Sequence, residues 1–164
     1  MPKISKSKIS PCLWFNTQAE EAAKFYTSLL PNSEITKVQR SPTDYPGGKE
    51  GAVLMVEFTL AGQSYLALNG GSDGVYTDAL SLIIDCKDQA EVDRLWDAFL
   101  KAGGKAVACG WLQDRWGVRW QITPSILLEL IAGPDKAKAA RVFQAMMGMV
   151  KIDIAELEKA AAGR

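Results

Sequence analysis

An internal repeat constrains the fold of this chain more than any other feature of its sequence. The tripeptide Gln-Ala-Glu at 18–20 recurs 71 positions later, at 89–91. An apolar stretch typical of a strand precedes it both times, at 12–15 and at 80–84. Because a strand and a helix start align together, the repeat predicts two copies of one structural unit.

Each copy contains one predicted helix. Thr17 with Glu20, and Asp88 with Glu91, have the spacing of a capping box, in which the first side chain caps the helix and the second reaches back. A Pro-Asn pair ends the first helix and two glycines end the second. The expected helices are 19–30 and 90–102.

Three strand candidates follow each helix, so each half of the chain is predicted to be βαβββ. They are 34–39, 53–60 and 63–69 in the first half, and 105–108, 111–113 and 118–123 in the second. Segment 41–51 has the proline and glycine content of a mobile loop. From residue 135 the pattern becomes helical, and a further short helix is expected over 153–162 behind an Asp153–Glu156 capping box.

The composition excludes several classes of function. The 164 residues include 19 basic and 19 acidic side chains and no histidine. A neutral chain lacks the basic excess that binds nucleic acid. Without histidine there is no imidazole to act as general base, to bind a metal or to activate a serine or cysteine. No apolar run approaches the roughly 20 residues that a membrane helix needs.

The cysteines and the N-terminus predict a cytoplasmic protein. Cys12, Cys86 and Cys109 are an odd number without CxxC spacing, which fits a reducing compartment. Residues 1–8 are basic but lack the apolar core and cleavage site of a signal peptide.

Particular segments of the chain resemble a known family. They are PCLWF at 11–15, AEEAAKFY at 19–26, LNGG at 68–71, CGWLQDR at 109–115, WQITP at 120–124 and AMMGMVKID at 145–153. Together they resemble the PhnB-like branch, labelled 3-demethylubiquinone-9 3-methyltransferase, of the vicinal oxygen chelate superfamily of glyoxalases and dioxygenases. The similarity extends over about 9–163.

The resemblance implies an α+β fold in which two tandem βαβββ modules form a cupped mixed sheet, followed by C-terminal helices. The modules are expected at about 9–70 and 79–132 and the helical tail at about 135–163, within a single domain, 1–164. The implied ligand pocket lies on the concave face of the sheet. The open edges of each module also predict a homodimer.

In that superfamily one His or Glu from each of four strands holds a metal. By strand phase, the matching positions here are Ser10, Ser81, Gln121 and either Leu66 or Asn69, depending on the register of strand 63–69. Stable metal sites use imidazole, thiolate or carboxylate ligands. We therefore expect no metal and no cofactor.

Strand alternation indicates which side chains share the pocket, because neighbouring residues of a strand point to opposite faces. Trp14, Asp85 and Arg119 are expected beside Ser10, Ser81 and Gln121, and such a set suits a small aromatic or anionic molecule. Asp114 is either a turn residue or a base. The pocket candidates are Ser10, Trp14, Leu66, Asn69, Ser81, Asp85, Trp111, Asp114, Arg119 and Gln121.

These residues predict a metal-independent protein that binds an unidentified small molecule. One alternative is a metal-free enzyme in which Asp85 or Asp114 is the base and Arg119 with Gln121 holds an oxyanion. Another is a structural or regulatory dimer with a vestigial pocket. The methyltransferase label lacks support, because no glycine-rich turn joins a predicted strand to a following helix, as binding of S-adenosylmethionine requires in a doubly wound sheet.

Overall fold

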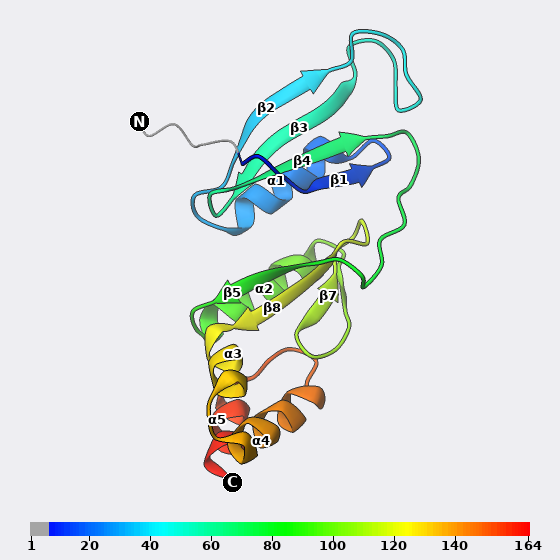
Figure 1. Cartoon of the computed structure of the whole chain (residues 1–164). Helices are drawn as coiled ribbons and strands as arrows, with labels where there is room; N and C mark the ends of the chain where they lie inside the picture. Colours follow the sequence, from blue (N-terminus) through cyan, green and yellow to red (C-terminus); the bar gives the residue numbers. More distant parts are fainter. Residues whose placement is uncertain (1–6) are drawn as a thin grey trace. The chain divides into compact units, whose positions relative to one another are not determined.

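The computed structural model describes residues 7–164, which form two compact units (Figure 1). One unit ends at Val75 and the other begins at Tyr76. The N-terminal segment in which no signal peptide is expected lies, up to residue 6, outside the described residues.

The two units repeat one topology, which confirms the predicted pair of βαβββ modules. The first contains β1 (Cys12–Phe15), α1 (Ala19–Leu29), β2 (Glu34–Arg40), β3 (Val53–Leu60) and β4 (Gln63–Asn69). The second contains β5 (Ser81–Cys86), α2 (Gln89–Lys101), β6 (Lys105–Ala106), β7 (Trp111–Gln113) and β8 (Arg119–Pro124). The strand orders are β1-β4-β3-β2 and β5-β8-β7-β6. Each sheet is mixed, because β1 runs parallel to β4 and β5 to β8 while the other pairs are antiparallel.

A helix packs on one face of each sheet and buries the core of its unit. In the first unit Tyr26 of α1 stacks on Phe58 of β3, with 6.3 Å between ring centroids. In the second unit Phe99 of α2 lies 5.0 Å from Trp120 of β8. All four side chains are buried. We call the opposite face of each sheet, which no helix of the βαβββ module covers, the open face.

The capping residues predicted in the second unit are confirmed, but the prediction that Thr17 and Glu20 cap the first helix is wrong. The Asp88 side chain accepts from the backbone N–H of Glu91, and Asp153 accepts from that of Glu156. Helix α1 has no side-chain cap from its own N-terminal residues. Instead, Asn69 Oδ1 at the end of β4 accepts from the Ala19 N–H at 2.8 Å.

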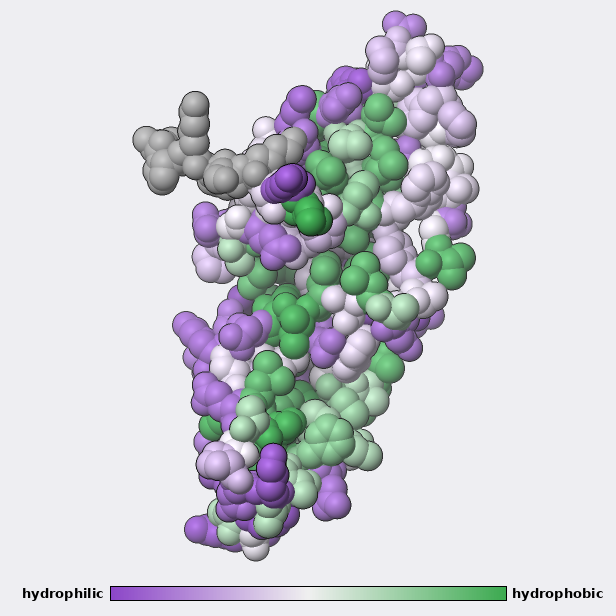
Figure 2. Space-filling view, viewed as in Figure 1, coloured by the Kyte–Doolittle hydropathy of each residue, from purple (hydrophilic) through white to green (hydrophobic). Residues whose placement is uncertain are grey.

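Three helices follow β8: α3 (Ser125–Ala132), α4 (Lys136–Met147) and α5 (Ile154–Ala162). Helix α3 was not expected, because its apolar residues are nearly continuous and show no helical period. Leu127, Val142, Ile152 and Leu157 form a small buried cluster among these helices. Figure 2 shows hydrophobic and hydrophilic residues interspersed on the surface of both units. Within residues 7–164, every helix is too short or too polar to cross a membrane.

Several hydrogen bonds involve the 41–51 loop. Its proline and glycine content predicts a mobile segment. Buried Ser41 exchanges backbone bonds with Gly51 and Ala52, and the Tyr45 hydroxyl donates to the Val53 carbonyl oxygen. The Lys49 ammonium and the Glu50 N–H hold the pKa of the Asp44 carboxyl below its ordinary value. These contacts connect the two ends of the loop to each other and the loop to the first residue of β3.

Candidate functional site

The open face of the second sheet carries its predicted site residues in register. Ser81, Arg119 and Gln113 form one row across β5, β8 and β7. Ile83, Gln121 and Trp111 form the next row. Neighbouring strands are about 4.8 Å apart and successive rows about 6.6 Å apart. Four of the predicted pocket residues therefore lie close together: Ser81, Trp111, Arg119 and Gln121.

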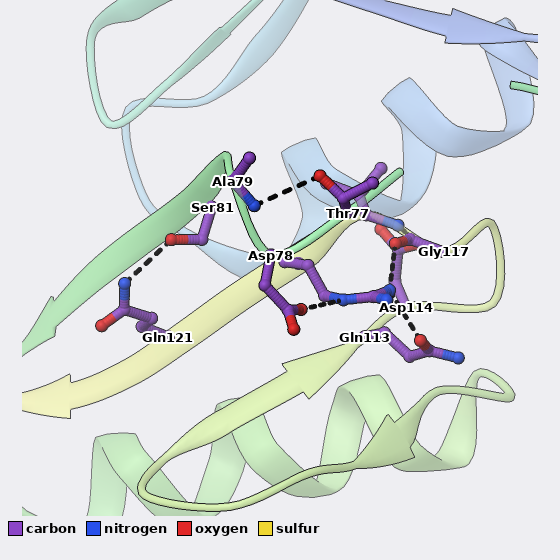
Figure 3. A network of polar contacts seen from close by, with 10 residues as sticks. Thr77, Asp78, Ala79, Ser81, Gln113, Asp114, Gly117 and Gln121 are labelled. Atoms are coloured by element: carbon purple, nitrogen blue, oxygen red, sulfur yellow. Dashed lines mark hydrogen bonds and ion pairs between the residues drawn. The ribbon is translucent and has the colours of Figure 1, made fainter. Parts of the chain in front are cut away.

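Gln121 is held by its neighbour on β5. Its Nε2 atom donates to the Ser81 Oγ at 2.8 Å, a contact shown in Figure 3. Within residues 7–164, the Gln121 side-chain carbonyl oxygen has no hydrogen-bond donor. The hydrogen bond thus fixes the amide and leaves its acceptor available on the open face.

Arg119 is held more firmly, by three acceptors that belong to Asp78, Gln113 and Gly117, which are labelled in Figure 3. Its Nε donates to Asp78 Oδ1 at 2.6 Å, and its Nη1 donates to Gln113 Oε1 at 2.6 Å and to the Gly117 carbonyl oxygen at 2.7 Å. The Arg119 side chain is 19% exposed, whereas that of Asp78 is 74% exposed. The guanidinium is therefore oriented by the protein, and no described residue accepts from its Nη2.

Two residues of this arrangement were missed from the sequence. Gln113 follows Trp111 by two positions on one strand, so alternation could have found it. Asp78 lies in the connection before β5, which belongs to no helix or strand and shows no periodic signal.

The register of β4 settles which of two residues lies on the open face of the first sheet. Leu66 pairs with Cys12, and Asn69 pairs with buried Phe15. Leu66 is therefore on the open face, and Asn69 lies on the side of α1. Ser10 and Leu66 line a hollow of about 190 Å³. Its other lining residues are Thr36, Glu57, Phe58, Thr59, Ser64 and Tyr65.

Trp14 positions the segment that follows β4. Its indole N–H donates to the Ser72 carbonyl oxygen at 2.8 Å. A Cβ atom at Gly70 would lie 1.9 Å from the Trp14 ring, so only glycine lets the chain pass there. The ring is 40% exposed, and its packing explains part of the glycine content of this segment.

Asp114 lies on the helix side of its sheet and not among the open-face residues. It is 2% exposed. One carboxylate oxygen accepts from the Trp116 and Val118 backbone N–H groups, and the other accepts from the Trp120 indole at 3.0 Å. Asp85 is exposed on the open face of the same sheet, two positions after Ile83 on β5, and its carboxylate accepts from the Ser125 hydroxyl. Asp114 is thus a turn residue, as one of the two sequence interpretations has it.

The residues at the family's metal positions do not fit a metal. Ser10, Leu66, Ser81 and Gln121 carry no imidazole, thiolate or carboxylate group. Between residues 7 and 164 there is no group of three His, Cys, Asp or Glu side chains that could hold an ion. Burial raises the pKa of the Cys12 thiol, which disfavours the thiolate that binds metals.

The remaining cysteines offer no better ligand set. All three are free thiols. Burial, followed by the nearby Glu91 and Asp85 carboxylates, raises the pKa of Cys86 to about 12. Cys86 also points to the helix side, because it follows buried Ile84 by two positions on β5. We derive no chemistry through a metal for this chain.

The structure also lacks the loop that binds S-adenosylmethionine in doubly wound methyltransferases. Its connections from strand to helix are 16–18, 87–88 and the direct junction of β8 with α3. None of these described connections contains a glycine. The sheets are mixed, whereas the doubly wound fold has a largely parallel sheet.

Comparisons with known proteins agree with this fold. The family model of 3-demethylubiquinone-9 3-methyltransferase matches residues 7–123 and ends before α3. A PhnB protein from Bacillus cereus, provisionally described as that methyltransferase, is 35% identical. The match covers 72% of this chain and 99% of that one, with a TM-score of 0.64.

Two further solved structures are similar. A Staphylococcus aureus protein is 33% identical over 70% of this chain and 93% of its own, with a TM-score of 0.33. A Pseudomonas aeruginosa protein is 19% identical over 72% of this chain and 97% of its own, with a TM-score of 0.59, which is a likeness of fold alone. No curated protein matches the chain. The chain belongs to the 3-demethylubiquinone-9 3-methyltransferase domain family, the PhnB-like branch of the vicinal oxygen chelate superfamily.

Proposed function

We propose that this protein binds a small organic molecule, without a metal, on the open face of the second sheet. The observation that carries the proposal is a set of polar side chains held in place by each other, each with hydrogen-bonding capacity left over. Gln121 keeps an acceptor, Arg119 keeps the Nη2 donors and Ser81 keeps its hydroxyl proton. Such preorganisation lowers the entropy cost of binding.

The neighbouring apolar side chains support the same proposal. Ile83 and Trp111 flank Gln121 in its row, and Ile83 is 52% exposed. Ligand sites are mostly apolar, with a few polar groups that fix orientation. Tryptophan adds a large flat surface on which a ring can stack.

The proposal stops at binding, because the carboxylates expected as bases have other partners. Asp114 accepts three hydrogen bonds on the helix side of the sheet. Asp85 accepts from Ser125 at the start of α3. Asp114 is therefore not on the face of the Gln121 row, and the carboxylate of Asp85, which is on that face two positions after Ile83, is held by Ser125.

Replacing Gln121 with alanine is expected to weaken ligand binding about tenfold, because the ligand loses its contact with the amide and Ser81 loses its partner. The ligand is sought by native mass spectrometry of the purified protein and by thermal shift against a panel of small organic acids, alcohols and amides. Gln39→Ala is the matched control, since Gln39 is exposed on β2 of the other unit. A ligand bound equally well by wild type and Gln121→Ala refutes the site.

We also propose that the protein is a homodimer. In each sheet the outer strands, β1 and β2 or β5 and β6, have an edge that pairs with no other strand of the described chain. Unpaired edges are usually covered, and a second copy is the simplest cover. Light scattering at micromolar concentration is expected to give twice the 17.8 kDa mass of the chain. A mass of one chain under these conditions contradicts the proposal.

A further inference from the structure

The ion pair between Asp78 and Arg119 joins two very different positions. Arg119 lies on the central strand β8 and is mostly buried. Asp78 is mostly exposed and lies in the 76–80 connection, outside every helix and strand. In Figure 3 it extends from this connection toward the guanidinium. Asp78 can therefore leave Arg119 without the loss of any strand pairing.

The contact occupies only part of the edge at which a guanidinium binds a carboxylate. In the side-on geometry, arginine binds a carboxylate through two parallel N–H groups, those of Nε and Nη2. Here one Asp78 oxygen takes Nε, while Nη1 is fixed by Gln113 and Gly117 on the other side. A two-point carboxylate contact at this edge requires Nε, so it requires Asp78 to leave.

The next row of the same face provides the surface for the rest of such a ligand. Trp111 and Ile83 lie one row from Arg119, a separation of about 6.6 Å along the strands. The two rows are neighbours on one face, so a ring joined to a carboxylate at Arg119 can pack toward these apolar side chains. Gln121 lies between the two apolar side chains in the row.

We propose that the ligand class of this site is the small aromatic carboxylates, and that Asp78 is a competitive latch that holds Arg119 until such a carboxylate displaces it. This inference rests on the proposed function, because it names the ligand class and the regulation of the same open face. Only molecules in which Asp78 has released Arg119 can bind the carboxylate side-on, so the apparent Kd equals the intrinsic Kd divided by the fraction of such molecules.

The test uses benzoate as the probe and NMR titration of the full chain as the measurement. Benzoate is expected to shift the Arg119 Nε–H and Trp111 indole N–H resonances of the wild type. Asp78→Asn removes the competing carboxylate and is expected to bind benzoate about three- to fivefold more tightly. Arg119→Gln is expected to abolish binding. Asp97→Asn, on the exposed side of α2 in the same unit, changes the net charge equally and is expected to leave the affinity unchanged.

The outcomes separate the latch, the ligand class and the proposed function. Equal benzoate affinity of Asp78→Asn and wild type refutes the latch alone. Absence of benzoate binding in the wild type and in Asp78→Asn, or equal binding of benzyl alcohol, refutes the carboxylate class. The proposed function still stands in those cases if another molecule binds the wild type and is lost in Gln121→Ala. It fails if no ligand depends on Gln121.

Discussion

Replacing Asp114 with alanine is expected to lower the free energy of unfolding of the second unit by about 3–5 kcal/mol. The buried carboxylate accepts the Trp116 and Val118 backbone N–H groups and the Trp120 indole N–H. Alanine removes the carboxylate that accepts all three hydrogen bonds, and losing one partner of a buried hydrogen bond costs about 1–3 kcal/mol. Urea unfolding followed by tryptophan fluorescence measures the change.

Two further variants make this result interpretable. Asp114→Asn keeps an acceptor for the backbone donors but places an amide N–H against the Trp120 indole, so about half of the loss is expected. Asp97→Ala, a substitution of the same type on the exposed side of α2, is expected to change stability by no more than about 0.5 kcal/mol. If Asp114→Ala is as stable as the wild type but no longer binds ligand, the structural role is contradicted and Asp114 is a binding residue.

Replacing Asn69 with leucine is expected to destabilise the first unit by about 2–4 kcal/mol. The buried amide makes two hydrogen bonds that leucine cannot replace. Its oxygen accepts from the Ala19 N–H at 2.8 Å, and its nitrogen donates to the Val53 carbonyl oxygen at 2.9 Å. Helix α1 thereby loses its N-terminal cap, and β3 loses a partner at its first residue. The shift of the urea midpoint measures the loss.

Substitution by aspartate separates the two contributions. Asn69→Asp keeps the acceptor at the N-terminus of α1, where negative charge is favourable, and loses only the donor to Val53. It is expected to be more stable than Asn69→Leu. Asn16→Leu is the control, since Asn16 donates to Asp73 at 3.2 Å in an exposed contact and should cost less than about 1 kcal/mol. Equal stability of Asn69→Leu and Asn16→Leu would contradict the capping role.

The candidate site was only partly predictable from the sequence. The alternation of β5 and β8 correctly brought Ser81, Arg119 and Gln121 onto one face, because period-two geometry is local. Asp78 could not be found, since its partner is 41 positions away and no pattern marks the connection. The sequence allowed Asp114 to be either a turn residue or a base. Its hydrogen bond with the buried Trp120 indole, which the sequence does not predict, identifies it as a turn residue.

The sequence by itself determined the repeated βαβββ order, most element boundaries and the chemistry of the side chains. Those properties depend on hydrophobic period, turn residues and caps within a few positions of each other. The tertiary structure alone decided that Leu66 and not Asn69 is on the open face, and that α1 is capped from 50 residues away. The alternation within one strand does not show which of its two faces is covered by the helix. Only its pairing with the neighbouring strand shows this.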